Sequence, residues 1–258
     1  MNVIYSFRKL NHPHHKPIDD RFFTMAKLSV EMAKKYHKTI FYGDQYSHNM
    51  FKSMGIVFDK SVVLDTINTY EGDITSYAKI MAMLEQTEPY ACVDFDTLLF
   101  EKISTNSTIT FGYPEVSDLK VYNILKNKDS SEYIEYIETF YKNHLEKYRN
   151  RFPEYVDSNL NHIPNYSLFI VNNPYLIKEI IKHILNAFNI DELEEVGAMY
   201  LEQYLISAYL QGIGADVSFL YNDTETKITD ILRTIKYKFH HYIDYYLDDD
   251  FDKKVNMI

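Results

Sequence analysis

Two aspartates separated by a single residue, Asp94 and Asp96, are the side chains best placed in this sequence to do chemistry. They follow the apolar run at 90–93, which predicts a buried strand that ends where a sheet meets solvent. Ligand sites in open α/β sheets lie at such carboxyl ends. In an extended chain, residues i and i+2 point to the same side, so we expect the two carboxylates to converge. Paired carboxylates repel unless a cation lies between them, and their oxygens suit Mg²⁺ or Mn²⁺, which also bind phosphate oxygens.

The segments around this motif alternate between apolar runs and helical spacings. This alternation predicts the α/β class, with a Rossmann-like, mostly parallel central sheet flanked by helices. The predicted strands are 3–7, 39–42, 61–64, 90–93, 107–113, 165–171 and 217–220, and the apolar pattern resumes at 97–100 after the aspartates. The predicted helices are 21–36, 45–54, 74–86, 130–148, 174–188 and 195–210. We expect one domain over 1–258, with a helical insertion around 117–150 and a C-terminal helical tail.

Composition excludes several classes of protein. Apolar residues make up 46% of the 258 residues, which favours a packed fold over disorder. The seven glycines form neither G-x-G-x-x-G nor G-x-x-x-x-G-K, so a fold built on glycine-rich phosphate loops is not expected. A net charge of −10 disfavours duplex DNA as a partner. With one cysteine, Cys92, no signal-like start and no stretch of membrane-spanning length, we expect a cytoplasmic location.

The motif also carries a family resemblance. The helix residues Tyr77-Ala-Lys-Ile and the segment 88–97 around the aspartates resemble the core of GT-A glycosyltransferases, which place a helix and a short strand before an Asp-x-Asp motif. The likeness is to small bacterial and viral members of uncharacterised families. It implies a GT-A-like fold, a UDP- or GDP-sugar donor, and Mn²⁺ or Mg²⁺. In such enzymes the first aspartate contacts the ribose or sugar and the second ligates the metal, which implies these roles for Asp94 and Asp96. Asp94 also stays a candidate metal ligand and catalytic residue.

The same resemblance implies further roles. Lys79, upstream on a predicted helix, is expected to approach the donor. Many GT-A enzymes take another metal ligand from a histidine near the C-terminus, and His240 and His241 lie in that part of the chain. Adjacent residues in a strand point oppositely, so one of them would serve, and we favour His241. Glu202 is the candidate base or acceptor-orienting residue, because an inverting enzyme needs a base beside the acceptor hydroxyl.

Residues near the ends of other predicted strands complete the expected donor site. In the resembling fold the edge after the first strand meets the nucleotide base, so Tyr5 or Phe7 is expected to stack on it and Arg8 to face phosphate. Asp44, after the second strand, is expected to reach the same pocket. Asn165 precedes a strand where similar enzymes place sugar or acceptor contacts.

Three alternative functions are weighed against the transferase. A haloacid dehalogenase-like phosphatase has a threonine four residues after its first aspartate, whereas Thr97 comes three after Asp94. A nucleotidyltransferase would bring a glycine-rich or basic loop near the first strand, and none is visible in the sequence. A non-catalytic nucleotide-sugar-binding module remains open. The acceptor of a transferase would be a glycan, a lipid-linked sugar, a protein or a modified nucleotide.

Overall fold

The computed structural model is built on a seven-stranded sheet and a separate two-stranded one. The strands are β1 (Asn2–Phe7), β2 (Lys38–Gly43), β3 (Lys60–Val63), β4 (Tyr90–Val93), β5 (Thr97–Leu99), β6 (Ile109–Phe111), β7 (Leu168–Val171), β8 (Val217–Phe219) and β9 (Phe239–His241). The large sheet has the order β3-β2-β1-β4-β7-β6-β8, and β5 pairs with β9. The structure describes residues 1–9, 18–72, 74, 76–112, 139, 142–143, 145–156, 163–188, 200–220 and 239–241.

Most neighbouring strands of the large sheet run parallel. β1 is parallel to β2 and β4, β2 to β3, and β6 to β8. β7 is the exception and runs antiparallel to both of its neighbours, β4 and β6. The predicted α/β class, with a mostly parallel central sheet flanked by helices, is therefore confirmed.

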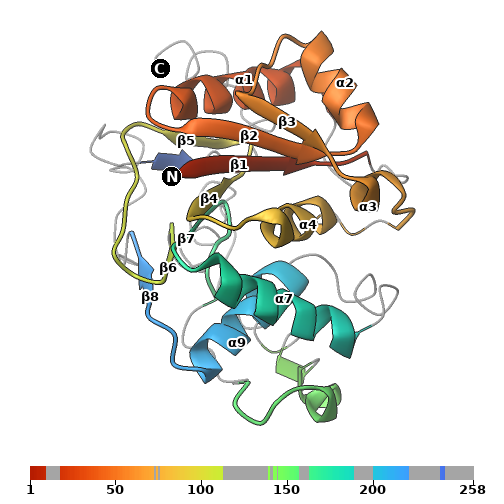
Figure 1. Cartoon of the computed structure of the whole chain (residues 1–258), viewed down its shortest axis with the longest axis vertical. Helices are drawn as coiled ribbons and strands as arrows, with labels where there is room; N and C mark the ends of the chain where they lie inside the picture. Colours follow the sequence, from red (N-terminus) through yellow and green to blue (C-terminus); the bar gives the residue numbers. More distant parts are fainter. Residues whose placement is uncertain are drawn as a thin grey trace, which may run out of the picture.

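Helices cover both faces of this sheet (Figure 1). They are α1 (Asp20–Lys34), α2 (Gln45–Ser53), α3 (Asp65–Asn68), α4 (Tyr77–Glu85), α7 (Pro174–Ala187) and α9 (Ile206–Gly212), with a short 3₁₀ helix at Arg149–Arg151. In Figure 1, α1 and α2 lie on one side of the sheet, while α4, α7 and α9 lie on the other. The sequence predicts all of the longer helices, although α4 begins three residues later than expected, and it misses the single turn α3.

Local signals explain where several helices begin and end. The side chain of Asp19 accepts hydrogen bonds from the first amides of α1, and Asn173 caps α7, which starts at Pro174. Gly55, with a φ of 72°, follows α2 and allows the left-handed turn that ends it. The helical insertion expected around 117–150 and the C-terminal tail fall largely outside the described residues.

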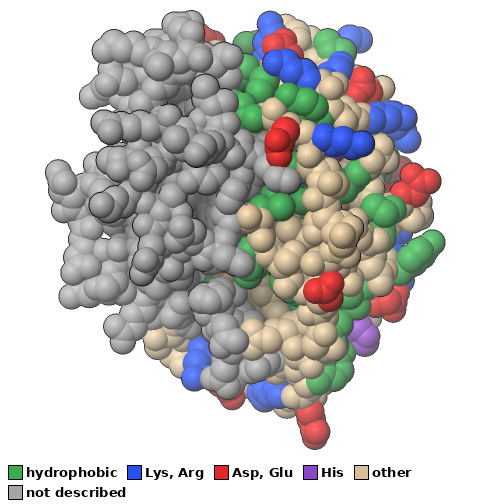
Figure 2. Space-filling view, turned by 90° about the vertical axis from the view of Figure 1, so that its left-hand side faces the viewer, with side chains coloured by type: hydrophobic (Ala, Val, Ile, Leu, Met, Phe, Trp, Pro, Cys, Tyr) green, Lys and Arg blue, Asp and Glu red, His purple; other side chains and the backbone are tan. Residues whose placement is uncertain are grey.

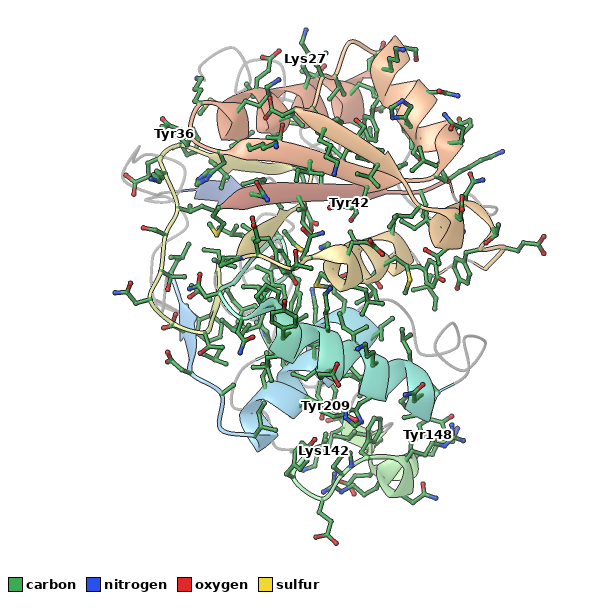
Figure 3. The ribbon with its side chains drawn as sticks, viewed as in Figure 1. Lys27, Tyr36, Tyr42, Lys142, Tyr148 and Tyr209 are labelled. Carbon is green, nitrogen blue, oxygen red and sulfur yellow. The ribbon has the colours of Figure 1, made fainter. Side chains whose placement is uncertain are left out.

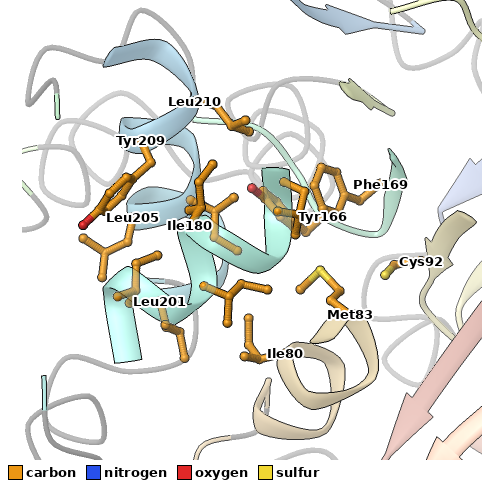
Figure 4. Close-up of a cluster of buried hydrophobic side chains, with 14 of the residues drawn as sticks. Ile80, Met83, Cys92, Tyr166, Phe169, Ile180, Leu201, Leu205, Tyr209 and Leu210 are labelled. Atoms are coloured by element: carbon orange, nitrogen blue, oxygen red, sulfur yellow. The ribbon is translucent and has the colours of Figure 1, made fainter. Parts of the chain in front are cut away.

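The alternation of side chains along the strands divides the interior into two cores. Val3 and Tyr5 of β1 face α1 and α2, whereas Ile4 faces α4. Figure 4 shows the larger core, in which side chains of α4, α7 and α9 meet those of β4 and β7. Tyr42 belongs to this core, between the sheet and α4 (Figure 3). Burying side chains on both faces is what makes the runs in β4 and β7 continuously apolar.

The two-stranded sheet brings the far end of the chain to the aspartate motif. β5 begins directly after Asp96, and its antiparallel pairing places His241 opposite Thr97. The apolar pattern at 97–100 thus belongs to a strand outside the central sheet. On the face shown in Figure 2, acidic and basic side chains of the described residues are interspersed. Among the described residues, no helix combines the length and the apolar character needed to cross a membrane.

Candidate active site

The segment from Asp94 to Thr97 is a tight turn, not extended chain. The amide of Thr97 donates to the carbonyl of Asp94 at 3.0 Å, which closes a four-residue β-turn. The expectation that Asp94 and Asp96 share one side because the chain is extended is therefore wrong in its geometry. The middle residue, Phe95, is 8% exposed, and its ring stacks on Phe51 with centroids 4.8 Å apart. This anchored ring fixes the turn, so that the aspartates on either side of it are held at the end of β4.

A buried network of hydroxyl groups supports the same turn from behind. Ser29 of α1 donates from Oγ to the carbonyl of Thr97 at 2.5 Å. The hydroxyl of Tyr5 donates to the carbonyl of Ser29 at 3.1 Å and lies 3.0 Å from its Oγ. All three residues have no exposed surface. Tyr5 is thus a core residue that braces the turn, and the prediction that it stacks on a nucleotide base is wrong because its ring is covered.

Phe7 also faces this interior. Its ring packs against Phe22 and Phe51, with centroids 5.5 Å away in each case. Phe7 is half-buried. Its expected stacking on the nucleotide base stays a prediction.

Lys79 joins two other predicted site residues. Its Nζ lies 2.6 Å from Oδ1 of Asp94 and 2.5 Å from Oε1 of Glu202. It also donates to the carbonyl of Tyr166 at 3.2 Å. An ammonium group has three donors, and these acceptors use all of them. Residues from α4, the end of β4 and the segment before α9 therefore meet in one ion cluster at the carboxyl edge of the sheet.

Burial and neighbouring charges shift the pKa values of Lys79 and Glu202 in this cluster. Burial alone would lower the pKa of Lys79, but the carboxylates of Asp94 and Glu202 raise it above its usual value. Burial raises the pKa of Glu202 above 4.5, and the nearby charge of Asp94 adds to this, against the opposing effect of Lys79. One ammonium serves two carboxylates, so the cluster carries excess negative charge. It therefore favours an added proton or cation.

Glu202 lies on an unusual stretch of backbone. The segment Tyr200–Leu205 is a π-helix that leads into α9. Such turns are rare and occur frequently at functional sites. The apolar neighbours Leu201 and Leu205 are buried in the core shown in Figure 4, while the carboxylate reaches Lys79. Glu194 and Glu195, which precede Glu202 in the sequence, lie outside the described residues.

The segment before β7 runs beside Asp94. The amide of Asp94 donates to the carbonyl of Ser167 at 2.9 Å, and Oδ1 of Asn165 accepts from the amide of Ser167 at 2.8 Å. Asn165 is 6% exposed and shapes the backbone at this point. Oγ of Ser167 is buried, and the described part of the chain offers it no hydrogen-bond partner. Apart from their position next to Asn165, no signal in the sequence pointed to Ser167 or to the carbonyl of Tyr166.

The metal site expected at Asp94, Asp96 and His241 is described only in part. Both aspartates are half-buried, and the backbone of His241 lies opposite Thr97, next to Asp96 in sequence. Within the described side chains, no group of three or more His, Cys, Asp or Glu residues could hold a metal. The side chains of His240 and His241 are outside that set, so their part in a metal site stays a prediction.

Asp44 and Arg8 lie at the ends of the neighbouring strands. Oδ1 of Asp44 accepts from the amide of Ser47 at 2.6 Å, and Oδ2 accepts from the amide of Lys9 at 2.7 Å. Asp44 thus caps α2 and connects the residues that follow β1 to the start of this helix. Arg8 is 3% exposed, and its guanidinium lies over the ring of Tyr70, 4.5 Å from the centroid.

Comparison with known proteins gives matches among solved structures alone. No protein-family model matches the sequence, and no curated protein matches it significantly. The mouse xyloside xylosyltransferase 1, in its apo form, is 11% identical over 85% of each chain, with a TM-score of 0.44. An active-site mutant of LgtC is 12% identical over 100% of this chain and 96% of that one, with a TM-score of 0.46. Similarity of this degree carries no argument about activity, which must come from the site itself.

Proposed function

We propose that the chain is a glycosyltransferase that moves a sugar from a UDP- or GDP-sugar donor to a hydroxyl acceptor with the help of Mn²⁺ or Mg²⁺. The observation that carries the proposal is the clamp that Lys79 makes between Asp94 and Glu202, at the carboxyl edge of the sheet. Sites for phosphate-bearing ligands in α/β sheets lie at this edge. The clamp holds one carboxylate that is partly exposed, Asp94, and one that is largely buried, Glu202. Two carboxylates in different surroundings can take different roles, here ligand binding and proton transfer.

The two aspartates of the turn have separate tasks in this proposal. One oxygen of Asp94 is held by Lys79, and its side chain is 37% exposed, so its other oxygen is directed to a hydroxyl of the donor sugar. Asp96 holds the cation, with Asp94 and an imidazole from His241 as the other candidate ligands. Carboxylate and imidazole donors suit Mn²⁺ and Mg²⁺. The ion would neutralise the charge that develops on the departing nucleoside diphosphate.

Glu202 is the candidate general base. Its raised pKa brings the carboxylate closer to the range in which it can take a proton at neutral pH. The acceptor oxygen forms a bond to the anomeric carbon, and the bond from that carbon to the phosphate oxygen breaks. The proton of the acceptor hydroxyl goes to Glu202, while Lys79 keeps the carboxylate in place.

A thermal-shift panel of nucleotide sugars, with and without Mn²⁺, tests this function. A donor that binds the folded state should raise the melting temperature, and more so with Mn²⁺. Asp96→Asn should lose the part of the shift that depends on Mn²⁺. Glu202→Gln, which keeps an oxygen for Lys79, should keep donor binding and lose transfer.

Two outcomes of that panel would contradict the proposal. If no nucleotide sugar raises the melting temperature in either condition, the donor-binding claim fails. If a donor binds but the wild-type chain neither hydrolyses nor transfers its sugar, the chain is a nucleotide-sugar-binding module.

A further inference from the structure

Arg8 follows β1 and is bonded to the loop that leads into α4. Its Nη2 donates to the carbonyl of Gly72, and its Nε donates to the carbonyl of Lys9 at 3.2 Å. Its guanidinium lies over the ring of Tyr70, 4.5 Å from the centroid. Arg8 is only 3% exposed, so these contacts are shielded from solvent. Arg8 therefore fastens the loop at 70–72 to the end of β1.

A stack of two tyrosine rings connects Arg8 to the first turn of α4. The centroids of the Tyr70 and Tyr77 rings are 3.8 Å apart and their planes are inclined by 20°, so the guanidinium and the two rings form three successive layers. Tyr77 is the first residue of α4, and the side chain of Ser76 at the N-cap makes no capping hydrogen bond. The stack therefore holds the start of a helix that its N-cap side chain leaves unfixed.

Lys79 lies in the same helical turn, two residues after Tyr77. Successive residues of an α-helix are about 100° apart around its axis, so residues two apart lie on nearly opposite sides. A ring fixed on one side of the turn therefore sets the rotation of the turn, and with it the direction of Lys79 on the other side. Nζ of Lys79 lies 2.6 Å from Asp94 and 2.5 Å from Glu202, and both contacts depend on that direction.

These contacts form a closed path between the sheet and α4. Arg8 follows β1 and Asp94 follows β4, and the two strands are parallel neighbours with Ile4 opposite Cys92. From the sheet the path runs through Arg8 and the two rings to α4, and it returns through Lys79 to Asp94. The helix that carries the ammonium group is thus tied at its first turn to the same sheet edge that carries the carboxylate. Residues that lock a site side chain in this way determine how well its geometry is kept.

We propose that Arg8 is a positioning residue, which through the two stacked rings holds the ammonium group of Lys79 in the ion cluster. The proposal concerns the arrangement of the cluster, and its consequence for sugar transfer rests on the proposed function. The stack works through its planar groups, the guanidinium and the two rings, and does not need the tyrosine hydroxyls. Removing a planar group should therefore displace Lys79, whereas removing a hydroxyl should not.

The position of Lys79 can be followed by ¹H–¹⁵N NMR of its ammonium group in the full chain. This group is largely buried and has three acceptors, so its protons should exchange slowly enough to give a signal, which is identified by its loss in Lys79→Met. Arg8→Met should shift this signal by more than its linewidth or broaden it. Tyr77→Leu should do the same, and Tyr77→Phe, which keeps the ring, should leave the signal in place.

The matched control is Arg149→Met. Like Arg8, Arg149 donates to backbone carbonyls, in this case those of Pro153, Glu154 and Val156. Removing either arginine leaves acceptors without donors, so both variants should lower the melting temperature. None of the hydrogen bonds described for Arg149 reaches the stack or the ion cluster, so its replacement should not move the Lys79 signal. The two variants thus separate a loss of stability from a displacement of Lys79.

Several results would overturn the proposal. A signal that stays in place in Arg8→Met would show that Arg8 does not position Lys79, and equal displacement in Arg149→Met would trace the effect to lost stability. Equal displacement in Tyr77→Phe and Tyr77→Leu would exclude the ring, and these two variants decide the matter if Arg8→Met does not fold. No signal in wild type would contradict the closed cluster itself. Absence of sugar transfer would count against the proposed function and would leave the NMR result standing.

Discussion

Replacing Lys79 by methionine removes the charge that holds Asp94 and Glu202 and keeps most of the side-chain length. The Lys79–Glu202 pair is largely buried, with 13% and 11% of the two side chains exposed. Breaking a buried pair by removing one partner costs about 3–5 kcal/mol, because the other charge is left uncompensated. Asp94 is 37% exposed, so solvent screens its share of the loss. We therefore expect Lys79→Met to lose about 3 kcal/mol of unfolding free energy at pH 7.

The loss should shrink as the pH falls. The folded-state pKa of Glu202 is already above 4.5, and without Lys79 it rises further. The folded variant then binds a proton at a pH at which the unfolded chain does not, so its stability increases as the pH falls from 7 toward 4.5. Lys79 itself has a raised pKa, so in wild type its ammonium group stays charged below pH 10.5 and loses its proton only in the alkaline range.

Urea unfolding of four proteins measures this effect. Wild type, Lys79→Met, Glu202→Gln and the double variant form a double-mutant cycle at pH 7 and pH 5. The double variant should recover part of the loss, because no buried carboxylate is left at position 202. Lys182→Met is the control, since Lys182 pairs with Glu179 at 2.8 Å on the exposed face of α7 and should give no measurable change.

Two results would refute this reasoning. A loss below about 1 kcal/mol in Lys79→Met at pH 7 would mean that the charges are not desolvated as the structure indicates. A coupling energy near zero in the cycle would mean that Lys79 and Glu202 do not interact.

Three further predictions concern the frame around the site. Burial lowers the pKa of His37, whose Nε2 accepts from the amide of Ile103 at 3.1 Å, so unfolding free energy should fall as the pH drops from about 6.5 through the folded-state pKa. Thermal unfolding between pH 5 and 8 should show a flatter profile for His37→Gln, and an unchanged profile would exclude this histidine as the cause. Phe95→Ala should cost about 3–4 kcal/mol in urea unfolding and weaken Mn²⁺ binding, whereas unchanged metal affinity would show that the ring does not fix the turn. Gly212→Ala should lower the melting temperature, because its Cβ would lie 1.7 Å from the carbonyl oxygen of Tyr155, and an unaltered melting temperature would contradict that close approach.

The elements of the fold could be predicted because their signals are local. The apolar run of β4 and the capping residues around α7 are contiguous in sequence, and they gave strands and helices within a few residues of their bounds. The antiparallel direction of β7 could not be read in this way. A four-residue apolar strand has the same pattern in either direction, because it is buried on both faces.

The sequence predicted which residues belong to the site, but not which of them contact one another. Lys79, Asp94 and Glu202 were each proposed separately, but their contact joins residues up to 123 positions apart and leaves no local signal. Tyr5 was misjudged because a residue near the end of a strand is exposed or buried according to what packs on it. Here α1 and the turn around Phe95 cover its ring, which the sequence of β1 alone does not reveal.

The central claim is that Asp96 holds a cation beneath the diphosphate of a sugar donor. It is tested most directly by hydrolysis of the nucleotide sugar that best stabilises the chain, measured with Mn²⁺ and with EDTA for wild type and Asp96→Ala. The account predicts that wild type releases the nucleoside diphosphate with Mn²⁺ and loses this activity in EDTA, and that Asp96→Ala stays folded and inactive in both. Equal hydrolysis by wild type and Asp96→Ala in the presence of Mn²⁺ would contradict it.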